Sequence, residues 1–309
     1  MQLASSALRY LGQIVMPELP EVETVRRGLE PILVGNAFAR VEQRRPDLRF
    51  PLPKRFGERL SGRKIEALDR RAKYLLARLD DGEVLVMHLG MTGSFSIDYA
   101  NGDAEAPGRF AHPQADIPKH EHIVFHLSDG TAVRYSDARR FGYMDLIPEN
   151  ALEQHALFKG LGVEPLSPAF TPDSLASRLK GKATPIKVAL VDQRLIAGLG
   201  NIYANEALYS ARISPLKLAG SLATKSGKPT PKTEALVAAV TSVLEKAIRA
   251  GGSSLRDYRR ADGSLGSFQH RFKVYGREGK PCSRKGCGGT VRRIVQGGRS
   301  TFYCPTCQR

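Results

Sequence analysis

The 309-residue sequence has few cysteines, no long apolar run and comparatively few acidic residues. Because a membrane-spanning helix needs about 20 consecutive apolar residues, we expect a soluble protein without a membrane partner. All four cysteines fall near the C-terminus, so any thiolate chemistry is confined to that end. The length is enough for two ordinary domains and a small additional module.

Basic residues are in excess, with 47 Lys and Arg against 31 Asp and Glu and a formal net charge of +16. This excess indicates a polyanionic partner first, although membrane surfaces and acidic proteins would also attract such a chain. The basic residues occur in dispersed pairs such as Arg70-Arg71 and Arg139-Arg140. Dispersed pairs favour a folded basic surface over a disordered basic arm.

The first half of the chain reads as one helix followed by strands. Pro20 suits a first helical turn, and apolar residues at helical spacing follow it. Short alternating apolar runs then extend from about residue 41 to about residue 147, with Asp81-Gly82 and Asp129-Gly130 as hairpin turns. These residues predict an antiparallel β-sandwich or a flattened barrel.

From about residue 152 the pattern becomes helical. In "PIKVALVDQRLIAGLGNIYANEAL" the helical period breaks at Gly198 and Gly200, which predicts two helices that meet at a tight glycine turn. A longer helix is expected from about Thr233 to Ala250, ended by two glycines.

Two further segments stand apart from this pattern. Residues 98–118 are rich in Asn, Gly, Asp, Ala and Pro, which predicts a mobile insertion. Residues 1–15 have no acidic residue and a weak helical pattern, which is typical of a transit peptide. The alternative, which we favour, is a start codon assigned too far upstream, because Met16-Pro17 is itself a plausible beginning.

The four cysteines form two pairs with four and two intervening residues, separated by sixteen residues. Four thiolates at this spacing can close a tetrahedral zinc site and stabilise a hairpin with little core. Two disulfides are the alternative, but nothing in the sequence indicates secretion. We therefore predict one structural zinc ion per chain, bound by Cys282, Cys287, Cys304 and Cys307.

Two polar positions are candidates for phosphate binding. Arg299 lies between the cysteine pairs, where a metal-anchored hairpin would fix its side chain for a bidentate phosphate contact. Asn201 opens the helix after the glycine turn, an arrangement that can bind anions. Each also has a plain alternative, since Arg299 can be a solvated surface residue and a Gly-x-Gly before a helix is often only a turn.

Pro17 decides whether the sequence encodes an enzyme. Within a chain its nitrogen is a non-nucleophilic tertiary amide, but removal of Met16 would make it a secondary amine with an ordinary α-amino pKa near 8. Such an amine can attack a sugar's anomeric carbon and form an iminium ion. Glu18 and Glu21 lie close enough to supply a proton donor and an organising carboxylate, although both could be ordinary acids at a helix start.

Eight segments resemble, in order, the formamidopyrimidine-DNA glycosylase family of bacterial repair enzymes. They are "PELPEVETVRRGLEP", "RRAKYLL", "HLGMTGS", "KHEHIVF", "SDARRFG", "GLGNIYANEAL", "GGSSLRDY" and "RSTFYCPTCQR". The resemblance implies a multi-domain α+β protein with double-stranded DNA in a basic cleft. After the extension at residues 1–15, its domains are a catalytic helix and antiparallel β-sandwich (16–150), a helical helix-two-turns-helix DNA-binding domain with a loop over the damaged base (151–265), and a C-terminal four-cysteine zinc finger (266–309).

The resemblance also implies roles for single residues. By that analogy Pro17 is the nucleophile, Glu18 the proton donor, and Glu21 a second carboxylate of the site. Lys73 matches the residue linked to β-elimination and Arg299 the one linked to δ-elimination. The family inserts three residues into the DNA stack, and the matching positions are Met91, Arg139 and Phe141. Family residues that contact the DNA backbone match His120, Lys182 and Asn201. The family's contact to the damaged base matches Arg256.

The resulting hypothesis is a bifunctional DNA glycosylase and AP lyase of base excision repair that excises 8-oxoguanine and formamidopyrimidines. The expected protein is a monomer in the bacterial cytoplasm, associated with the nucleoid. One alternative is an endonuclease VIII-like enzyme for oxidised pyrimidines, and another is a non-catalytic, zinc-containing protein that binds damaged DNA.

Overall fold

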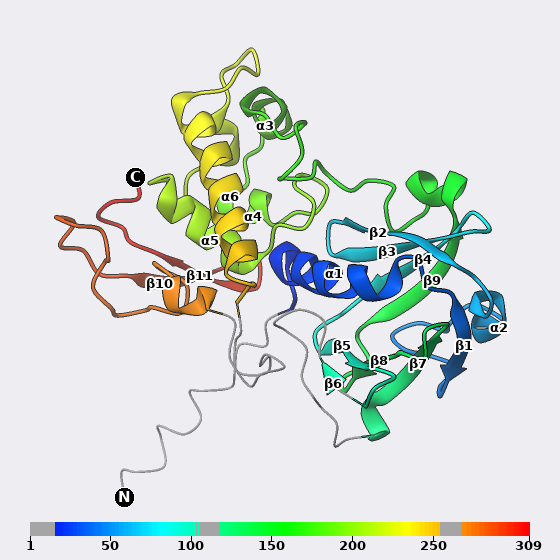
Figure 1. The fold of residues 1–309 in the computed structure, drawn as a ribbon. Coiled ribbons are helices and arrows are strands. Elements are labelled where there is room, and N and C mark those ends of the chain that lie inside the picture. Colours follow the sequence, from blue (N-terminus) through cyan, green and yellow to red (C-terminus); the bar gives the residue numbers. More distant parts are fainter. Residues whose placement is uncertain (1–15, 103, 106–117, 254–266) are drawn as a thin grey trace, which may run out of the picture.

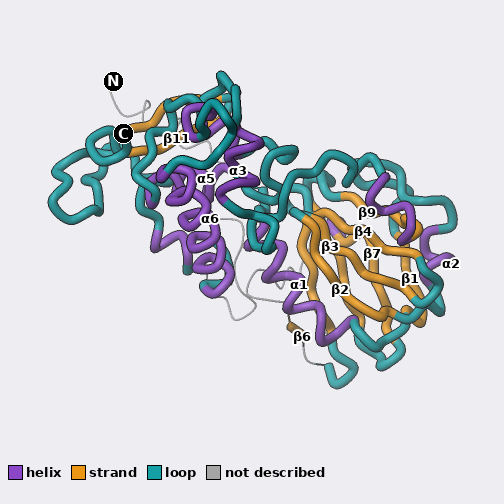
Figure 2. The backbone as a smooth tube through the Cα atoms, turned by 90° about the horizontal axis from the view of Figure 1, so that it is seen from above, coloured by secondary structure: helices purple, strands orange, loops and turns teal. Residues whose placement is uncertain are grey.

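In a computed structural model of the chain, residues 16–102, 104–105, 118–253 and 267–309 are described. They form a β-sandwich lobe and a helical lobe that carries a small β-hairpin, with the first helix lying between the two lobes (Figure 1; Figure 2). The proposed extension at residues 1–15, most of the insertion at 98–118, and Arg256 lie outside the described residues. No helix within the described ranges combines the length and apolar composition that a membrane crossing requires.

The elements of the sandwich lobe follow one another from the N-terminal side of the chain. They are α1 (Leu19–Leu33), β1 (Phe38–Gln43), α2 (Phe56–Leu60), β2 (Ile65–Arg71), β3 (Tyr74–Leu79), β4 (Glu83–His88), β5 (Gly93–Asp98), β6 (Ala104–Glu105), η2 (Pro118–His120), β7 (Glu121–Leu127), β8 (Ala132–Asp137), β9 (Tyr143–Pro148) and η3 (Glu149–Gln154).

The helical lobe and its hairpin take up the rest of the chain. Their elements are α3 (Pro172–Leu179), α4 (Ile186–Leu190), α5 (Asn201–Ser210), η4 (Ala219–Leu222), α6 (Pro231–Arg249), η5 (Phe268–Arg271), β10 (Arg292–Gln296) and β11 (Arg299–Tyr303).

Two antiparallel sheets build the sandwich, one with the strand order β1-β7-β8-β5-β6 and one with β2-β3-β4-β9. The hairpin turns predicted at Asp81-Gly82 and Asp129-Gly130 are confirmed, because they connect β3 to β4 and β7 to β8. Gly82 and Gly130 have φ of 78° and 88°, a backbone region that glycine adopts without strain. The predicted sandwich is therefore present.

The first helix contributes to both lobes. Its residues Val22, Val25, Leu29 and Leu33 belong to the core of the sandwich, which places one apolar face at helical spacing against the sheets. Its N-terminal backbone instead contacts the helical lobe, since Leu19 N donates to the carbonyl of Gly198 at 3.2 Å. The start of α1 is thus fixed between the lobes.

The core of the helical lobe continues into the cysteine-rich hairpin. Buried residues of α5 and α6 share one cluster with Val291, Phe302 and Cys304. The long predicted helix is confirmed as α6. The prediction that two helices meet at the glycine turn is wrong, because α4 already ends at Leu190 and α5 begins only at Asn201. Residues 191–200 between α4 and α5 form turns that include Gly198 at φ 82°.

Candidate active site at the lobe interface

Glu18 lies at the N-terminus of α1 and reaches the helical lobe. Its side chain is 4% exposed, and its Oε1 accepts a hydrogen bond from Ile202 N at 3.0 Å. A Cβ on Gly200 would lie 2.1 Å from Glu18 Cδ and 2.5 Å from its Oε2. Glycine at position 200 is therefore what allows the carboxyl group to approach α5.

The pKa of Glu18 is raised to about 7, because burial and, less strongly, the nearby Glu21 outweigh the opposing effects of the Lys73 ammonium and the amides of Ile202 and Tyr203. Desolvation disfavours the charged carboxylate. Glu18 Oε2 has no hydrogen-bond partner among the described residues. A carboxyl with this pKa can hold a proton near neutral pH and release it.

Glu21 is buried like Glu18, but both of its carboxylate oxygens accept hydrogen bonds. Its Oε1 accepts from Tyr203 Oη at 2.5 Å, from Ser253 N at 2.8 Å and from Ser253 Oγ at 3.0 Å. Its Oε2 accepts from Glu18 N at 3.0 Å. Burial still raises the pKa of Glu21, against these donors. Its contacts connect α1, α5 and the segment after α6.

Lys73 and Arg299 come from different lobes and meet at the same two cavities. Lys73 follows Ala72, whose φ of 52° marks the left-handed turn between β2 and β3; Arg299 begins β11. Both line a cavity of about 820 Å³ and an adjoining one of about 310 Å³, and Glu18 lines the smaller. Burial lowers the pKa of Lys73, Glu18 partly offsets this, and Arg299 lowers it further.

Lys187 on α4 is a residue that the sequence reasoning missed. Its side chain has no exposed surface, and its Nζ has no hydrogen-bond partner among the described residues. Its pKa is lowered to about 8, because burial and the nearby Arg299 outweigh the opposing effect of Glu18. The sequence does contain a signal, since a lysine stands between the apolar residues Ile186 and Val188. A lysine in such a segment can be buried, and buried lysines are rare outside functional sites.

The three residues expected to enter the DNA stack lie together at the rim of the larger cavity. Met91, Arg139 and Phe141 all line it. Phe141 is 41% exposed, and the Arg139 guanidinium carbon lies 4.8 Å from the centre of its ring. An exposed aromatic ring and a cation at a cavity mouth can both stack on nucleic-acid bases.

The remaining predicted DNA contacts are more scattered. His120 ends η2, and Lys182 follows α3, with its carbonyl accepting from Gly220 N at 2.8 Å. Neither side chain lines either of the two cavities in the described part of the chain. Asn201 lines the smaller cavity, and its Nδ2 donates to Ser300 O at 3.0 Å, which ties α5 to β11.

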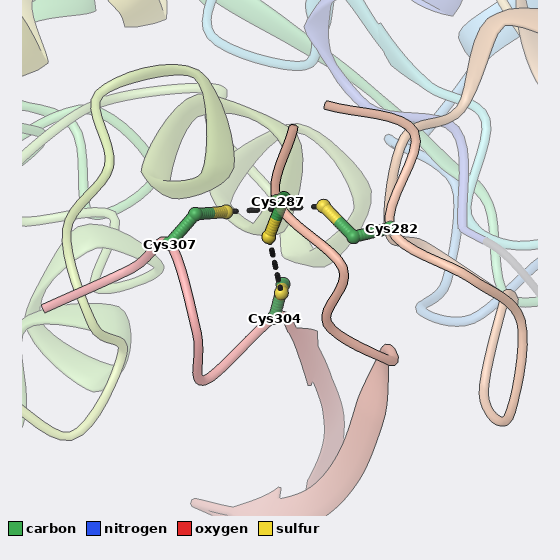
Figure 3. A group of neighbouring side chains, drawn as sticks. All are labelled: Cys282, Cys287, Cys304 and Cys307. Carbon is green, nitrogen blue, oxygen red and sulfur yellow. Dashed lines mark hydrogen bonds between the residues drawn. The ribbon is translucent and has the colours of Figure 1, made fainter. Parts of the chain in front are cut away.

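The four cysteines lie together beside the hairpin (Figure 3). Their Sγ atoms are all within 4.8 Å of one another, and two of the separations are 3.8 Å (Cys282 to Cys307) and 3.6 Å (Cys287 to Cys304). Tetrahedral Zn–S bonds of about 2.3 Å imply sulfur separations close to these values. The four thiolates therefore fit a structural zinc ion.

Known protein families match most of the chain. The Formamidopyrimidine-DNA glycosylase N-terminal domain matches residues 16–144, its H2TH domain residues 161–259, and the zinc finger found in FPG and IleRS residues 279–309. A relative from Beijerinckia indica named Formamidopyrimidine-DNA glycosylase is 59% identical, over 95% of this chain and all of the relative.

Solved structures agree with these matches. A Lactococcus lactis FPG mutant in complex with a Fapy-dG containing DNA has a TM-score of 0.78 at 35% identity, covering 95% of this chain and all of that one. The MutM (Fpg) protein of Thermus thermophilus has a TM-score of 0.76 at 41% identity, covering 94% of this chain and 98% of that one. The overall fold of this chain thus recurs in solved structures of Fpg proteins.

Proposed function

The chain belongs to the formamidopyrimidine-DNA glycosylase family, and from that premise we propose how its residues perform the reaction. The protein is a DNA glycosylase and AP lyase for oxidised purines and acts in DNA repair. The observation that carries the residue assignment is the proton-holding carboxyl of Glu18, which is buried next in sequence to Pro17 and shares a cavity with Lys73 and Arg299.

Pro17 is the nucleophile once Met16 has been removed. Its secondary amine attacks C1′ of the damaged nucleotide, the C1′–N bond to the base breaks with its electron pair on the base, and the proton that the amine loses goes to the departing base. Glu18 donates its proton to the opening sugar ring, so that an iminium joins Pro17 to C1′. The family match begins at residue 16, which supports Pro17 as the reacting position.

The later steps use the same iminium as an electron sink. Loss of a C2′ proton expels the 3′ phosphate in β-elimination, which we assign to Lys73, and a second elimination expels the 5′ phosphate, which we assign to Arg299. Burial lowers the pKa of Lys73, which favours a role in proton transfer. Glu21 orients Glu18 by accepting from its backbone N–H.

DNA binding uses the basic surface and the rim of the larger cavity. A net charge of +16 favours a phosphate backbone through counterion release. Met91 and Phe141 fill the stack that an extruded nucleotide vacates, and Arg139 contacts the orphaned base. Backbone contacts are assigned to His120, Lys182 and Asn201, and the loop over the damaged base to Arg256.

The cysteine cluster binds one zinc ion, which holds the hairpin that carries Arg299. The finer organisation follows the sequence-based division: a catalytic sandwich domain (16–150), a helical DNA-binding domain (151–265) and a zinc finger (266–309). The protein acts as a monomer without a membrane partner, in the cytoplasm and associated with the nucleoid.

Borohydride trapping on defined duplexes tests this proposal. Protein that begins at Pro17 forms a covalent adduct with DNA containing 8-oxoguanine or formamidopyrimidine, because borohydride reduces the iminium, whereas protein with an acetylated Pro17 forms none. Equal trapping and cleavage by the acetylated protein would exclude Pro17 as nucleophile. Faster excision of oxidised pyrimidines than of purines in the same panel would favour endonuclease VIII-like specificity, and binding without an adduct would favour the non-catalytic alternative.

A further inference from the structure

Two loops that carry the expected inserted residues pack against each other at the rim of the larger cavity. One loop connects β4 to β5 and carries Met91, and the other connects β8 to β9 and carries Arg139 and Phe141. The two loops are separated by more than 40 residues in sequence. Their mutual arrangement therefore has to be fixed by contacts between them.

Their backbones are in close contact. A Cβ on Gly90 would lie 2.2 Å from the carbonyl carbon of Phe141 and 2.3 Å from Gly142 N. A Cβ on Gly142 would lie 1.9 Å from Tyr135 Oη. Since real Cβ atoms do not come this close to other atoms, glycine is required at both positions, and the loops interlock without an intervening side chain.

Asp137 joins the two loops from beneath. Its side chain has no exposed surface. Its Oδ1 accepts from the Thr92 hydroxyl of the first loop and from Arg139 N of the second at 3.3 Å. Its Oδ2 accepts from Gly142 N at 2.7 Å and from Tyr135 Oη at 3.4 Å. A buried carboxylate that accepts several hydrogen bonds fixes its donors strongly.

Thr92 completes the connection. Its Oγ1 accepts from Arg139 N at 3.1 Å while its hydroxyl proton goes to Asp137. The carboxylate, the hydroxyl and the amide thus form one small network that spans both loops. Tyr135 lies on β8 beneath the same network, which anchors it to the sheet.

We propose that Asp137 is a positioning residue that holds the two loops as a single preorganised unit for insertion into the DNA stack. The proposal rests on the proposed function, because it assigns Met91, Arg139 and Phe141 to that insertion. Side chains that are already ordered lose less conformational entropy when they bind. Asp137 therefore acts on extrusion of the damaged nucleotide rather than on the chemistry at Pro17.

The first test replaces Asp137 by Asn, which keeps the shape but places an NH₂ group against an N–H or O–H donor. The matched control is Asp129→Asn in the β7–β8 turn, where the carboxylate also accepts from a turn amide, Thr131 N at 2.9 Å. A single-stranded oligonucleotide with an abasic site has no stack to fill, so borohydride trapping on it counts the active molecules in each preparation.

Per active molecule, we expect Asp137→Asn to excise 8-oxoguanine from a duplex about tenfold more slowly than wild type or Asp129→Asn, in line with the loss of a charged hydrogen bond. Trapping on the single strand keeps its wild-type rate. A 2-aminopurine beside the lesion, followed by stopped-flow fluorescence, shows slower unstacking in the variant. A variant that is only less stable would contain fewer active molecules, each with the wild-type rate.

Thr92 provides a second variant pair if Asp137→Asn does not fold. Thr92→Ser keeps the hydroxyl, and we expect it to unstack the lesion at the wild-type rate. Thr92→Val lacks the hydroxyl, and we expect it to unstack the lesion more slowly. Equal unstacking and excision rates in wild type and Asp137→Asn, or in Thr92→Ser and Thr92→Val, would overturn the role of the network. Failure of wild type to excise any lesion would instead overturn the proposed function.

Discussion

Replacing Glu18 by Gln is expected to remove base excision and at the same time stabilise the protein above neutral pH. Gln has the shape of a protonated Glu and never ionises, so it suits a position that is 4% exposed. In the wild type, ionisation of this buried carboxyl has a free-energy cost in the folded state. The substitution removes that cost.

The magnitude follows from the pKa of Glu18, which burial raises from 4.5 to about 7. Each tenfold change in an equilibrium constant corresponds to about 1.4 kcal/mol, so the raised pKa corresponds to about 3 kcal/mol. Below pH 4.5 the carboxyl is protonated in both the folded and the unfolded state, and the substitution changes nothing. As pH rises through 7 the wild type loses this stability, because the folded state binds the proton more tightly.

Thermal unfolding at pH 5 and pH 8 measures the effect. We expect Glu18→Gln to raise the unfolding temperature by on the order of 5 °C at pH 8 and by much less at pH 5. Glu30→Gln on the same helix serves as the control, because the Glu30 side chain is 48% exposed. An equal change at both pH values, or a loss of stability at pH 8, would refute the assignment of a raised pKa to Glu18.

Two further substitutions test the geometry of the site. Gly200→Ala places a Cβ 2.1 Å from Glu18 Cδ, so we expect base excision to fall at least a hundredfold, by about 3 kcal/mol in transition-state free energy, measured by single-turnover kinetics. The Glu164 carboxylate fixes the turn before Lys73, because it accepts hydrogen bonds from Ala72 N at 2.5 Å and from the Arg70 guanidinium at 3.1 Å. Glu164→Ala removes this acceptor. We expect a loss of about 2–3 kcal/mol in the free energy of unfolding and a slower β-elimination on abasic DNA, and unchanged elimination would exclude this role.

Local patterns predicted the elements of the fold well. The alternating runs around Asp81-Gly82 became β3 and β4, and the apolar face of the longest helix became the buried side of α6. These features depend on spacing along the chain, which the sequence shows directly. The early end of α4 at Leu190 was not predicted. The turns that follow it hydrogen-bond to residues about 30 positions earlier in the chain, since Gly162 N donates to Gln193 O and Ala197 N donates to Val163 O, and sequence spacing does not show such contacts.

The candidate site was only partly predictable, because its members meet through tertiary contacts. Glu18 was a candidate from its position next to Pro17, and Lys73 came from the family resemblance alone. The pKa of Glu18, however, depends on burial beneath Gly200 and Ile202, about 180 residues later in the chain. Lys187 was missed because a single charged residue in a short helix shows no periodicity. The role of Asp137 depends on a contact with Thr92, and sequence spacing gives no information about that contact.

The hydrogen bonds between α1 and the helical lobe make the reaction centre depend on both lobes. Ile202 N and Ser253 N, from the second lobe, hold Glu18 and Glu21 of the first, so neither lobe alone has a complete reaction centre. We therefore expect separately expressed lobes to be inactive unless they reassociate. We expect substitutions that break these hydrogen bonds to lower activity even where the protein stays folded.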